Sequence, residues 1–528
     1  MEKKNLIEKG LTSIGIEFGS TRIKAVLIGK DFSILATGIH DWENRLENGI
    51  WTYSEKDIKE GLSDCFTDLM KNVREKYGTE LRTTGSMGIS AMMHGYLAFD
   101  KENRLLVPFR TWRNTITAEA AEKLSDAFGF NIPQRWSVAH LYQAILNNEP
   151  HVSEIKFITT LAGYVHFLLT GKKVIGTGDG SGMFPVSADG KYNEAMLEKF
   201  GALTEETAFK EKLGDILPRI VPVGEASGTL TEEGARLLDK TGVFGGAVSF
   251  CPPEGDAQTG MVATNSIAPK TGNVSAGTSI FGMVVLEKEL SERYEQIDIV
   301  ATPEGNPVAM VHCNNCSTDL NCWVKLFGGI LELFGTSVPK DELYNKLFAA
   351  SLSAAGDMGG LVSCNYHSGE HVTGFTEGRP LLIRTPDSDF SVGNLMKCLI
   401  FSSLSTLKTG MDILIKQEKI SLEKIYAHGG LFKSPIAGQR FLAAALNVPV
   451  ELLESAGEGG AWGIAILAAY IERENKAMTL TEYLSENVFG DMKGEVMMPS
   501  ENDVSDFNDY AVKFGRMLSV EEAAVKAI

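Results

Sequence analysis

The chain has 528 residues, of which 44% are hydrophobic and 22% are charged. At roughly 100–200 residues per domain, this length predicts between two and four domains, and the hydrophobic fraction excludes a chain that is disordered throughout. The formal net charge of −18 excludes a broad cationic surface of the kind that binds nucleic acid or an anionic membrane.

The start of the chain, MEKKNLIEKGLTS, has no long apolar core after its lysines, so the sequence predicts no secretory signal. Apolar runs such as residues 461–470 are shorter than the roughly 20 residues that span a bilayer, so no membrane segment is expected. Seven cysteines in this length favour a reducing cytoplasm over a disulfide framework. The cluster of Cys313, Cys316 and Cys322 lacks a further cysteine or histidine to complete a tetrahedral metal shell. Buried thiols are therefore preferred over a metal or redox site.

Two segments about half a chain apart predict the same structure, a strand, a glycine turn and a second strand. Residues 13–28 place branched apolar residues on both sides of Gly19-Ser20-Thr21, and residues 271–286 do the same around Gly277-Thr278-Ser279. A hairpin repeated at this offset predicts two related domains, which we place at 1–265 and 266–528. A chance resemblance between glycine-rich hairpins is the alternative.

Strand-like and helix-like segments alternate along the chain, which predicts an α/β fold. The expected elements, in chain order, are a buried strand at 87–93, helices at 118–127, 141–147 and 162–169, a long helix at 395–417, a strand from 425 into Gly429-Gly430, and helices at 435–446 and 459–471. The last of these helices carries small residues that permit close packing. Residues 476–528 match no motif and are predicted to form a helical extension that packs on the body.

Four glycine turns are candidates for phosphate binding, because glycine lets a backbone approach a phosphate closely. They centre on Gly19, Gly255, Gly277 and Gly429. The P-loop pattern is absent: the nearest segment, residues 429–434, has Phe432 where the pattern needs its second glycine. The protein-kinase motifs are absent too. Phosphate binding therefore has to rest on hairpin turns, as in the actin-like ATPase architecture.

Three further segments carry groups that suit a sugar substrate. Asp256 lies in a glycine-flanked loop, where its carboxylate is suited to accepting the proton of a substrate hydroxyl; the alternative is a cap on the helix that follows. His94 follows a predicted strand, where ligands of α/β sheets bind, although a structural histidine is equally compatible. Residues 111–114, Thr-Trp-Arg-Asn, combine a flat apolar ring with polar donors; the alternative is a surface loop anchored by Trp112.

Taken together, these segments resemble the FGGY family of carbohydrate kinases over about residues 12–475. Residues 16–24 are similar to the first phosphate motif of the family, 275–279 to the second, and 255–257 to the segment with the catalytic base. Residues 93–95 resemble the Met-His-Gly of the family's xylulokinases and 111–114 their Trp-Asn-Asp segment. Residues 429–435 resemble the adenosine-site turn, and 458–463 the small-residue helix after it.

The resemblance implies two related actin-like, ribonuclease H-like ATPase domains flanking a nucleotide cleft, with ATP and Mg²⁺ as cofactors. It implies that Asp256 is the catalytic base and that the sugar-binding residues are Met93, His94, Trp112, Arg113, Asn114 and Asp256. It implies that ATP is bound by Gly19, Ser20, Thr21, Lys24, Gly277, Thr278, Ser279, Gly429, Gly430, Lys433 and Ser434. The metal would be reached by Glu17 and Asp256 through water. Asp179 resembles a family loop near the cleft and is left open.

Three departures from the family pattern bear on the metal and the sugar. Glu17 replaces the usual Asp of the first motif, and Met92 stands where xylulokinases usually carry Gln. Arg113-Asn114 stands where Asn-Asp is usual, which removes a carboxylate and adds a cation. Hydroxyl hydrogen bonds select an open-chain sugar, so these changes affect substrate identity more than kinase activity.

The resulting expectation is an ATP-dependent kinase that converts D-xylulose to D-xylulose 5-phosphate. L-ribulose, or another ketose or polyol, is the alternative within the same family. A catalytically weak sugar-binding regulator is the alternative of a different class. We expect a cytoplasmic protein without nucleic-acid or membrane partners, and a homodimer is left open.

Overall fold

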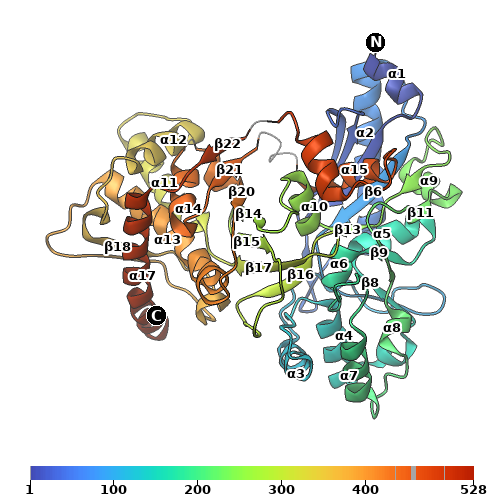
Figure 1. Ribbon diagram of the computed structural model, residues 1–528, viewed down its shortest axis with the longest axis horizontal. Helices are drawn as coiled ribbons and strands as arrows, with labels where there is room; N and C mark the ends of the chain where they lie inside the picture. The colour runs from blue at the N-terminus through green and yellow to red at the C-terminus, as the bar shows by residue number, and fades with distance from the viewer. Residues whose placement is uncertain (1, 435, 454–458, 493) are drawn as a thin grey trace. The chain divides into compact units, whose positions relative to one another are not determined.

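The computed structural model describes residues 2–434, 436–453, 459–492 and 494–528 (Figure 1). The chain forms two compact units. The first takes its described residues from 1–267, 299–308 and 458–491, and the second takes them from 268–298, 309–457 and 492–528.

The first unit contains a seven-stranded sheet with the strand order β11-β12-β6-β1-β2-β3, and β13 lies beside β6. Its strands are β1 (Ser13–Phe18), β2 (Arg22–Ile28), β3 (Ile34–Asp41), β6 (Ser86–Ala91), β11 (Gly228–Thr229), β12 (Ser249–Phe250) and β13 (Glu254–Gly255). The predicted hairpin is the antiparallel pair β1–β2, and β6 lies parallel on the other side of β1. Alternation of side chains along β1 decides its two faces: Ile14, Ile16 and Phe18 are fully buried in an apolar core, while Gly15 faces the opposite way.

The core face of this sheet is covered by α2 (Glu55–Tyr77), which begins at a capping box on Ser54 and ends at left-handed Gly78. The opposite face is covered by α15 (Gly459–Tyr470), which also packs against α10 (Asp256–Ala263). The backbones of β1 and α15 come so close that a Cβ on Gly15 would lie 2.1 Å from the carbonyl oxygen of Ala461. Small residues in α15 therefore permit the close packing that the sequence predicts.

This packing makes the compact units differ from two domains that follow one another along the chain. The change of unit after residue 267 lies close to the predicted 265/266 boundary. The described residues of 458–491, however, belong to the first unit rather than to a domain spanning 266–528, because α15 is buried against β1 and α10.

Additional elements of the first unit surround the sheet. Three two-stranded pairs are formed by β4 (Arg45–Glu47) with β5 (Ile50–Thr52), β7 (Leu97–Phe99) with β8 (Phe157–Thr159), and β9 (Val174–Gly176) with β10 (Arg219–Val221). The helices are α1 (Glu2–Glu8), α3 (Ala118–Phe128), α4 (Ser137–Leu146), α5 (Leu161–Thr170), α6 (Thr177–Ser181), α7 (Glu194–Thr204), α8 (Leu213–Ile216), α9 (Glu232–Leu238) and α16 (Leu480–Tyr483). The helix predicted from residue 141 begins earlier, at Ser137, whose hydroxyl donates to the Gly95 carbonyl at 2.6 Å.

The second unit repeats this topology. The second seven-stranded sheet has the order β16-β17-β15-β14-β20-β21-β22, with β14 and β15 as the predicted second hairpin. Residues 299–308, which include most of β16 and the start of β17, are counted with the first unit. The strands are β14 (Thr271–Ala276), β15 (Ile280–Val285), β16 (Asp298–Ala301), β17 (Pro307–Cys313), β20 (Lys424–Gly429), β21 (Val450–Leu452) and β22 (Glu495–Met497). As in the first unit, the hairpin is antiparallel, the next strand is parallel to it, and the far strand is antiparallel. The repeat and the α/β class are confirmed.

Helices of the second unit pack on this sheet and on one another. They are α11 (Ser317–Leu333), α12 (Lys340–Ser351), α13 (Val392–Asp412), α14 (Ala437–Leu446) and α17 (Glu501–Ala527), beside the strand pair β18 (Leu361–Cys364) and β19 (Leu381–Arg384). By length and composition, residues 392–417 would suffice to cross a membrane, but 78% of their apolar window is buried, as in a core helix. Of the predicted helix 435–446, residue 435 lies outside the described residues.

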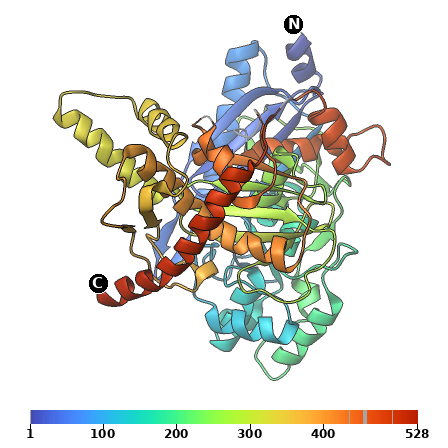
Figure 2. The ribbon, with the colours of Figure 1, turned by 60° about the vertical axis from the view of Figure 1, so that its left-hand side comes forward.

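The C-terminal segment is more integrated than the predicted extension. Residues 476–491 contain α16 and belong to the first unit, whereas β22 joins the sheet of the second unit at its edge. Helix α17 then lies along α14 and β18 (Figure 2). Arg440 of α14 forms two hydrogen bonds with Asp503 of α17, at 2.7 and 2.8 Å, which help to hold the helix in place.

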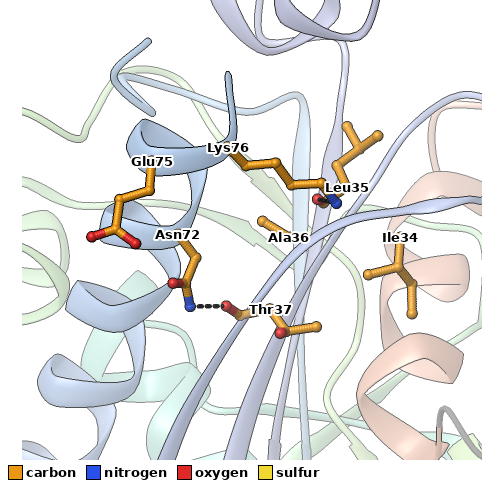
Figure 3. A pocket seen from close by; sticks show the side chains of 7 residues that line it. All are labelled: Ile34, Leu35, Ala36, Thr37, Asn72, Glu75 and Lys76. Atoms are coloured by element: carbon orange, nitrogen blue, oxygen red, sulfur yellow. Dashed lines mark hydrogen bonds between the residues drawn. The ribbon is translucent and has the colours of Figure 1, made fainter. Parts of the chain in front are cut away.

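A surface pocket lies between the edge strand β3 and α2 (Figure 3). Side chains of α2 occupy the free carbonyls of the strand: Asn72 donates to Thr37 at 2.8 Å, and Lys76 and Tyr77 both donate to Leu35. An edge strand with its carbonyls occupied cannot readily accept another strand. The pocket contains none of the predicted site residues, so the candidate site lies elsewhere.

Candidate active site

Asp256 is the first residue of α10, directly after β13. The helix cap is Gly255, so the structure does not use Asp256 as the N-cap. Its Oδ1 atom accepts the backbone N–H groups of Met93 at 3.1 Å and of Ala257 at 2.9 Å. Among the described residues no donor reaches Oδ2, which leaves this atom available to a ligand. Burial raises the pKa of Asp256 to about 6, so it is largely ionised at neutral pH.

Glu17 lies on β1 opposite Lys24 of β2. Its Oε2 atom accepts the N–H of Ala461 at 3.1 Å, and a Cβ on Gly460 would lie 2.4 Å from its Oε1 atom. Burial, and then the charge of Asp256, raise the pKa of Glu17 to about 7. The two carboxylates therefore sense each other, and the longer Glu side chain is accommodated because α15 presents small residues to it.

Two more carboxylates, those of Glu254 and Asp179, lie near Asp256. Glu254 accepts the N–H of Asp179 at 2.7 Å and that of Gly178 at 3.3 Å, and burial together with Asp179 raises its pKa to about 8. Asp179 accepts from Thr160 at 2.6 Å, and its Oδ1 atom has no hydrogen-bond partner among the described residues. Burial, reinforced by Asp256, raises the pKa of Asp179 to about 7. Sequence reasoning left Asp179 open and missed Glu254, because spacing alone does not separate two neighbouring acids.

Met93 and His94 follow β6 and lie against the Asp256 loop. His94 adopts a left-handed backbone, with φ of 67°, and Gly95 follows with φ of 83°. Such strain in a non-glycine residue persists only where the surroundings impose it, and it is frequent at functional sites. The His94 Nδ1 atom lies 3.0 Å from the Gly182 carbonyl, and the Met93 N–H contacts Asp256. The structure thus brings the predicted Met-His pair together with Asp256.

The predicted sugar-binding segment 111–114 contacts Trp51 of β5 through two of its side chains. The Asn114 amide bridges the N–H and the carbonyl of Trp51 in β5, both at 2.8 Å. The Arg113 guanidinium lies 4.0 Å above the Trp51 ring, and the Trp112 side chain is 37% exposed. Since Asn114 is buried with its amide bound to the protein, its observed contacts hold the β4–β5 pair in place. Trp112 and Arg113 keep exposed surface for a ligand.

The first glycine turn, Gly19-Ser20-Thr21, joins β1 to β2, and the second, Gly277-Thr278-Ser279, joins β14 to β15. Gly19 donates its N–H to Arg22 at 2.9 Å, and Gly277 donates its N–H to Ser279 at 2.8 Å. Among the described residues, the N–H groups of Ser20, Thr21, Thr278 and Ser279 have no protein acceptor. Free amides in a glycine turn are the groups that hold phosphate oxygens.

Gly429 ends β20 beside the second turn, in register with Ala276. Its backbone, with φ of 107° and ψ of −177°, is a conformation essentially reserved for glycine, and a Cβ there would lie 2.3 Å from the Ala276 carbonyl oxygen. Gly430 opens a 3₁₀ turn that leads to exposed Lys433 and buried Ser434. The structure therefore brings the predicted adenosine-site turn directly next to Gly277-Thr278-Ser279.

The cysteines show no metal or disulfide chemistry in the described chain. All seven are free thiols, and only Cys322 is exposed. Burial raises the pKa of Cys316 to about 12, and that of Cys313 well above its ordinary value. Across the described residues, no group of three His, Cys, Asp or Glu side chains forms a metal cage.

Glu370 underlies the loop that precedes α11 and provides a pH-dependent prediction. Its Oε2 atom accepts the N–H and the side-chain amide of Asn315, while Oε1 has no hydrogen bond among the described residues and lies 3.8 Å from Nδ1 of His371. Burial raises the pKa of Glu370 from an ordinary 4.5 to about 7. Between these values the folded chain keeps a proton that the unfolded chain has lost, so stability falls as pH rises, by on the order of 3 kcal/mol.

We therefore expect Glu370→Gln to make the fall of the unfolding free energy between about pH 5 and 8 smaller, by on the order of 3 kcal/mol. The other acids with raised pKa values keep the rest of the slope. Denaturant titrations of both proteins at each pH measure this difference. Glu377→Gln, at a largely exposed carboxylate of the same segment, is the matched control and should follow the wild type. Parallel curves for wild type and Glu370→Gln would contradict the assignment.

Family models match most of the chain. The N-terminal domain of the FGGY family of carbohydrate kinases matches residues 12–249, and the C-terminal domain of that family matches residues 272–472. The chain belongs to the FGGY family of carbohydrate kinases. It is therefore a carbohydrate kinase of the two-domain actin-like fold, and membership implies ATP as the phosphoryl donor. The family resemblance drawn from the motifs is confirmed.

Individual relatives are more distant. A xylulose kinase from Haemophilus influenzae is 24% identical over 494 residues, which cover 90% of this chain and 94% of the relative. The ligand-bound xylulose kinase structure from Lactobacillus acidophilus has a TM-score of 0.79 at 16% identity, over 96% of this chain and 98% of that chain. A gluconate kinase from the same organism has a TM-score of 0.78 at 16% identity, over 96% and 97%. These structures support the fold and do not separate one sugar from another.

Proposed function

We propose that this FGGY kinase transfers the γ-phosphoryl group of ATP to the terminal hydroxyl of a ketopentose, with Asp256 as the base. The observation that carries this is the carboxylate itself: two backbone N–H groups hold Oδ1, and Oδ2 has no donor in the described chain. A fixed, ionised carboxylate with one available oxygen is suited to accept the proton of a hydroxyl.

In the proposed transfer one bond forms and one breaks at the γ-phosphorus, and Asp256 takes up the proton. The substrate hydroxyl oxygen forms a bond to the γ-phosphorus, and its proton passes to Asp256 Oδ2. The bond from the γ-phosphorus to the bridging oxygen breaks, and ADP leaves with that electron pair. Since phosphoryl transfer depends chiefly on positioning and charge stabilisation, a fixed base and free turn amides are the contributions required of the protein.

Nucleotide binding is assigned to the two turns, to Lys24 and to the segment from Gly429 to Ser434. The free amides of the turns suit phosphate oxygens, and Lys24 and Lys433 supply positive charge. Glu17 and Asp256 fit a cation, because each is a half-buried carboxylate and the charge of Asp256 raises the pKa of Glu17. A bound Mg²⁺ would neutralise phosphate charge; these two residues would meet it through water.

The substrate is proposed as D-xylulose first and L-ribulose second. The Met93-His94 pair beside Asp256 and the xylulose kinase from Haemophilus influenzae support a ketopentose. Arg113 favours a second candidate, because an exposed cation in place of the usual amide suits an anionic sugar such as gluconate. A cytoplasmic location stays a prediction, and a homodimer stays open.

Release of ADP in the presence of a panel of ketopentoses, polyols, aldoses and gluconate tests this function. We expect the highest kcat/KM with D-xylulose and loss of activity in excess chelator. ADP release above background with none of the sugars would remove the kinase assignment and leave the sugar-binding regulator. Full activity in excess chelator would show that the reaction needs no Mg²⁺. A preference for gluconate would replace the ketopentose by an anionic sugar as the proposed substrate.

A further inference from the structure

The two glycine turns share a feature beyond their free amides: donors from neighbouring segments hold their carbonyl groups. In the first unit, the Trp42 indole Nε1 donates to the Gly19 carbonyl at 2.7 Å, and the Tyr53 hydroxyl donates to the Ser20 carbonyl at 2.6 Å. The Trp42 N–H also donates to the Thr21 carbonyl at 3.1 Å. Each carbonyl of this turn therefore has a donor.

The second unit achieves the same result with different residues. The Ser317 hydroxyl donates to the Gly277 carbonyl at 2.6 Å, and the Ser317 N–H donates to the same oxygen at 3.1 Å. The Cys316 N–H donates to the Thr278 carbonyl at 3.0 Å. Here the donors come from the start of α11 rather than from aromatic rings after β3.

Peptide geometry converts these bonds into an orientation of the amides. A trans peptide unit is planar, so its carbonyl and the N–H of the next residue point in opposite directions. A donor on the Gly19 carbonyl thus directs the Ser20 N–H to the other side, and a donor on the Gly277 carbonyl does so for Thr278. The same relation links the Ser20 carbonyl to the Thr21 N–H.

We propose that Trp42, Tyr53 and Ser317 are positioning residues that hold the turn carbonyls back and present the turn amides to the phosphates of ATP. This inference rests on the proposed function. The donors are themselves held: Trp42 and Tyr53 stack with ring centroids 4.0 Å apart and are nearly fully buried. The Cys316 carbonyl accepts from Asn365 and Ser403, both at 3.1 Å, which fixes the residue before Ser317.

Without the donors, a turn peptide is free to rotate and to present a carbonyl oxygen, which repels phosphate. Tyr53→Phe removes the hydroxyl that holds the Ser20 carbonyl, and the expected cost is about a 5- to 10-fold weaker binding of Mg-ATP. Ser317→Ala leaves the N–H of residue 317 on the Gly277 carbonyl, so a smaller loss, about 2- to 3-fold, is expected. Ser317 belongs to the unit that does not contain Asp256. Loss of its hydroxyl should therefore weaken the binding of Mg-ATP and leave the KM for the sugar within about twofold of the wild-type value.

The experiment measures the dissociation constant of Mg-ATP by calorimetry for Tyr53→Phe and Ser317→Ala, together with KM for ATP and for the sugar. Each variant has a matched control that removes a similar hydroxyl-to-carbonyl bond elsewhere in the same unit. Tyr77→Phe removes the bond to Leu35 at 2.9 Å, and Ser405→Ala removes the bond to Phe401 at 2.8 Å. Ser317→Thr keeps the hydroxyl and should restore binding.

We expect weaker Mg-ATP binding in the two anchor variants and wild-type binding in the two controls and in Ser317→Thr. If Ser317→Ala fails to fold, Tyr53→Phe and Ser317→Thr still decide. A wild type that binds no Mg-ATP would overturn this inference and the proposed function together. A wild type that binds Mg-ATP and phosphorylates sugar, with anchor variants that bind equally well, would overturn the inference alone.

Discussion

Asp256→Asn is expected to lower kcat by ~10²-fold or more while sugar still binds, because the substitution keeps the shape of the side chain but removes its basicity. The Asn side chain keeps an oxygen that can accept the N–H groups of Met93 and Ala257, so the start of α10 should be preserved. Steady-state kinetics gives kcat, and calorimetry with sugar alone gives the binding constant.

Asp126→Asn, at an exposed acid of α3 in the same unit, is the control and should keep wild-type turnover. Equal losses in both variants would indicate a general effect of charge. Near-normal turnover in Asp256→Asn would show that the base is another residue, and Asp179 and Glu254 would then be tested, since both lie near Asp256.

Gly463→Ala is expected to lower the free energy of unfolding strongly, because there is no space for a methyl group between α15 and α10 at this position. A Cβ on Gly463 would lie 2.0 Å from the Thr259 carbonyl oxygen, and backbone cannot yield as a flexible side chain can. Overpacking of this kind costs roughly 2–3 kcal/mol, which corresponds to a loss of roughly 2–5 °C in Tm for a protein of this size. Thermal unfolding followed by circular dichroism measures the effect.

Gly260→Ala is the matched control, since Gly260 lies on α10 and a Cβ there meets nothing within 4 Å. Alanine in a helix is favoured over glycine by about 1 kcal/mol, so this variant should equal or exceed the wild-type Tm. Asp256 begins the helix that Gly463→Ala displaces, so a loss of kcat should accompany the loss of stability. An unchanged Tm in Gly463→Ala would contradict the close packing of α15 on α10.

Local sequence signals predicted the parts of the molecule that depend on neighbouring residues. The two hairpins, the glycine turns and the small-residue helix are short patterns with a direct structural meaning, and each forms where it was predicted. Their repetition half a chain apart was sufficient to predict two units of the same topology. Asp256 could be singled out because its glycine-flanked loop precedes the second hairpin.

Contacts between distant segments could not be predicted in this way. Helix α15 lies near the end of the matched C-terminal family domain yet packs on β1, more than 400 residues earlier, a contact that sequence order does not reveal. Trp42, Tyr53 and Ser317 donate to the glycine turns from outside every motif. The hydrogen bonds of the Asn114 amide to Trp51 are another contact that no motif indicates, and its sugar-binding role stays a prediction.

The most direct test of the account is mass spectrometry of D-xylulose, and of the other sugars of the panel, after incubation with Mg-ATP and either wild type or Asp256→Asn. We expect a phosphorylated sugar with the wild type, formed together with ADP, and almost none in the same time with the variant. Phosphorylated sugar in equal amounts from both proteins, or from neither with any sugar, would contradict it.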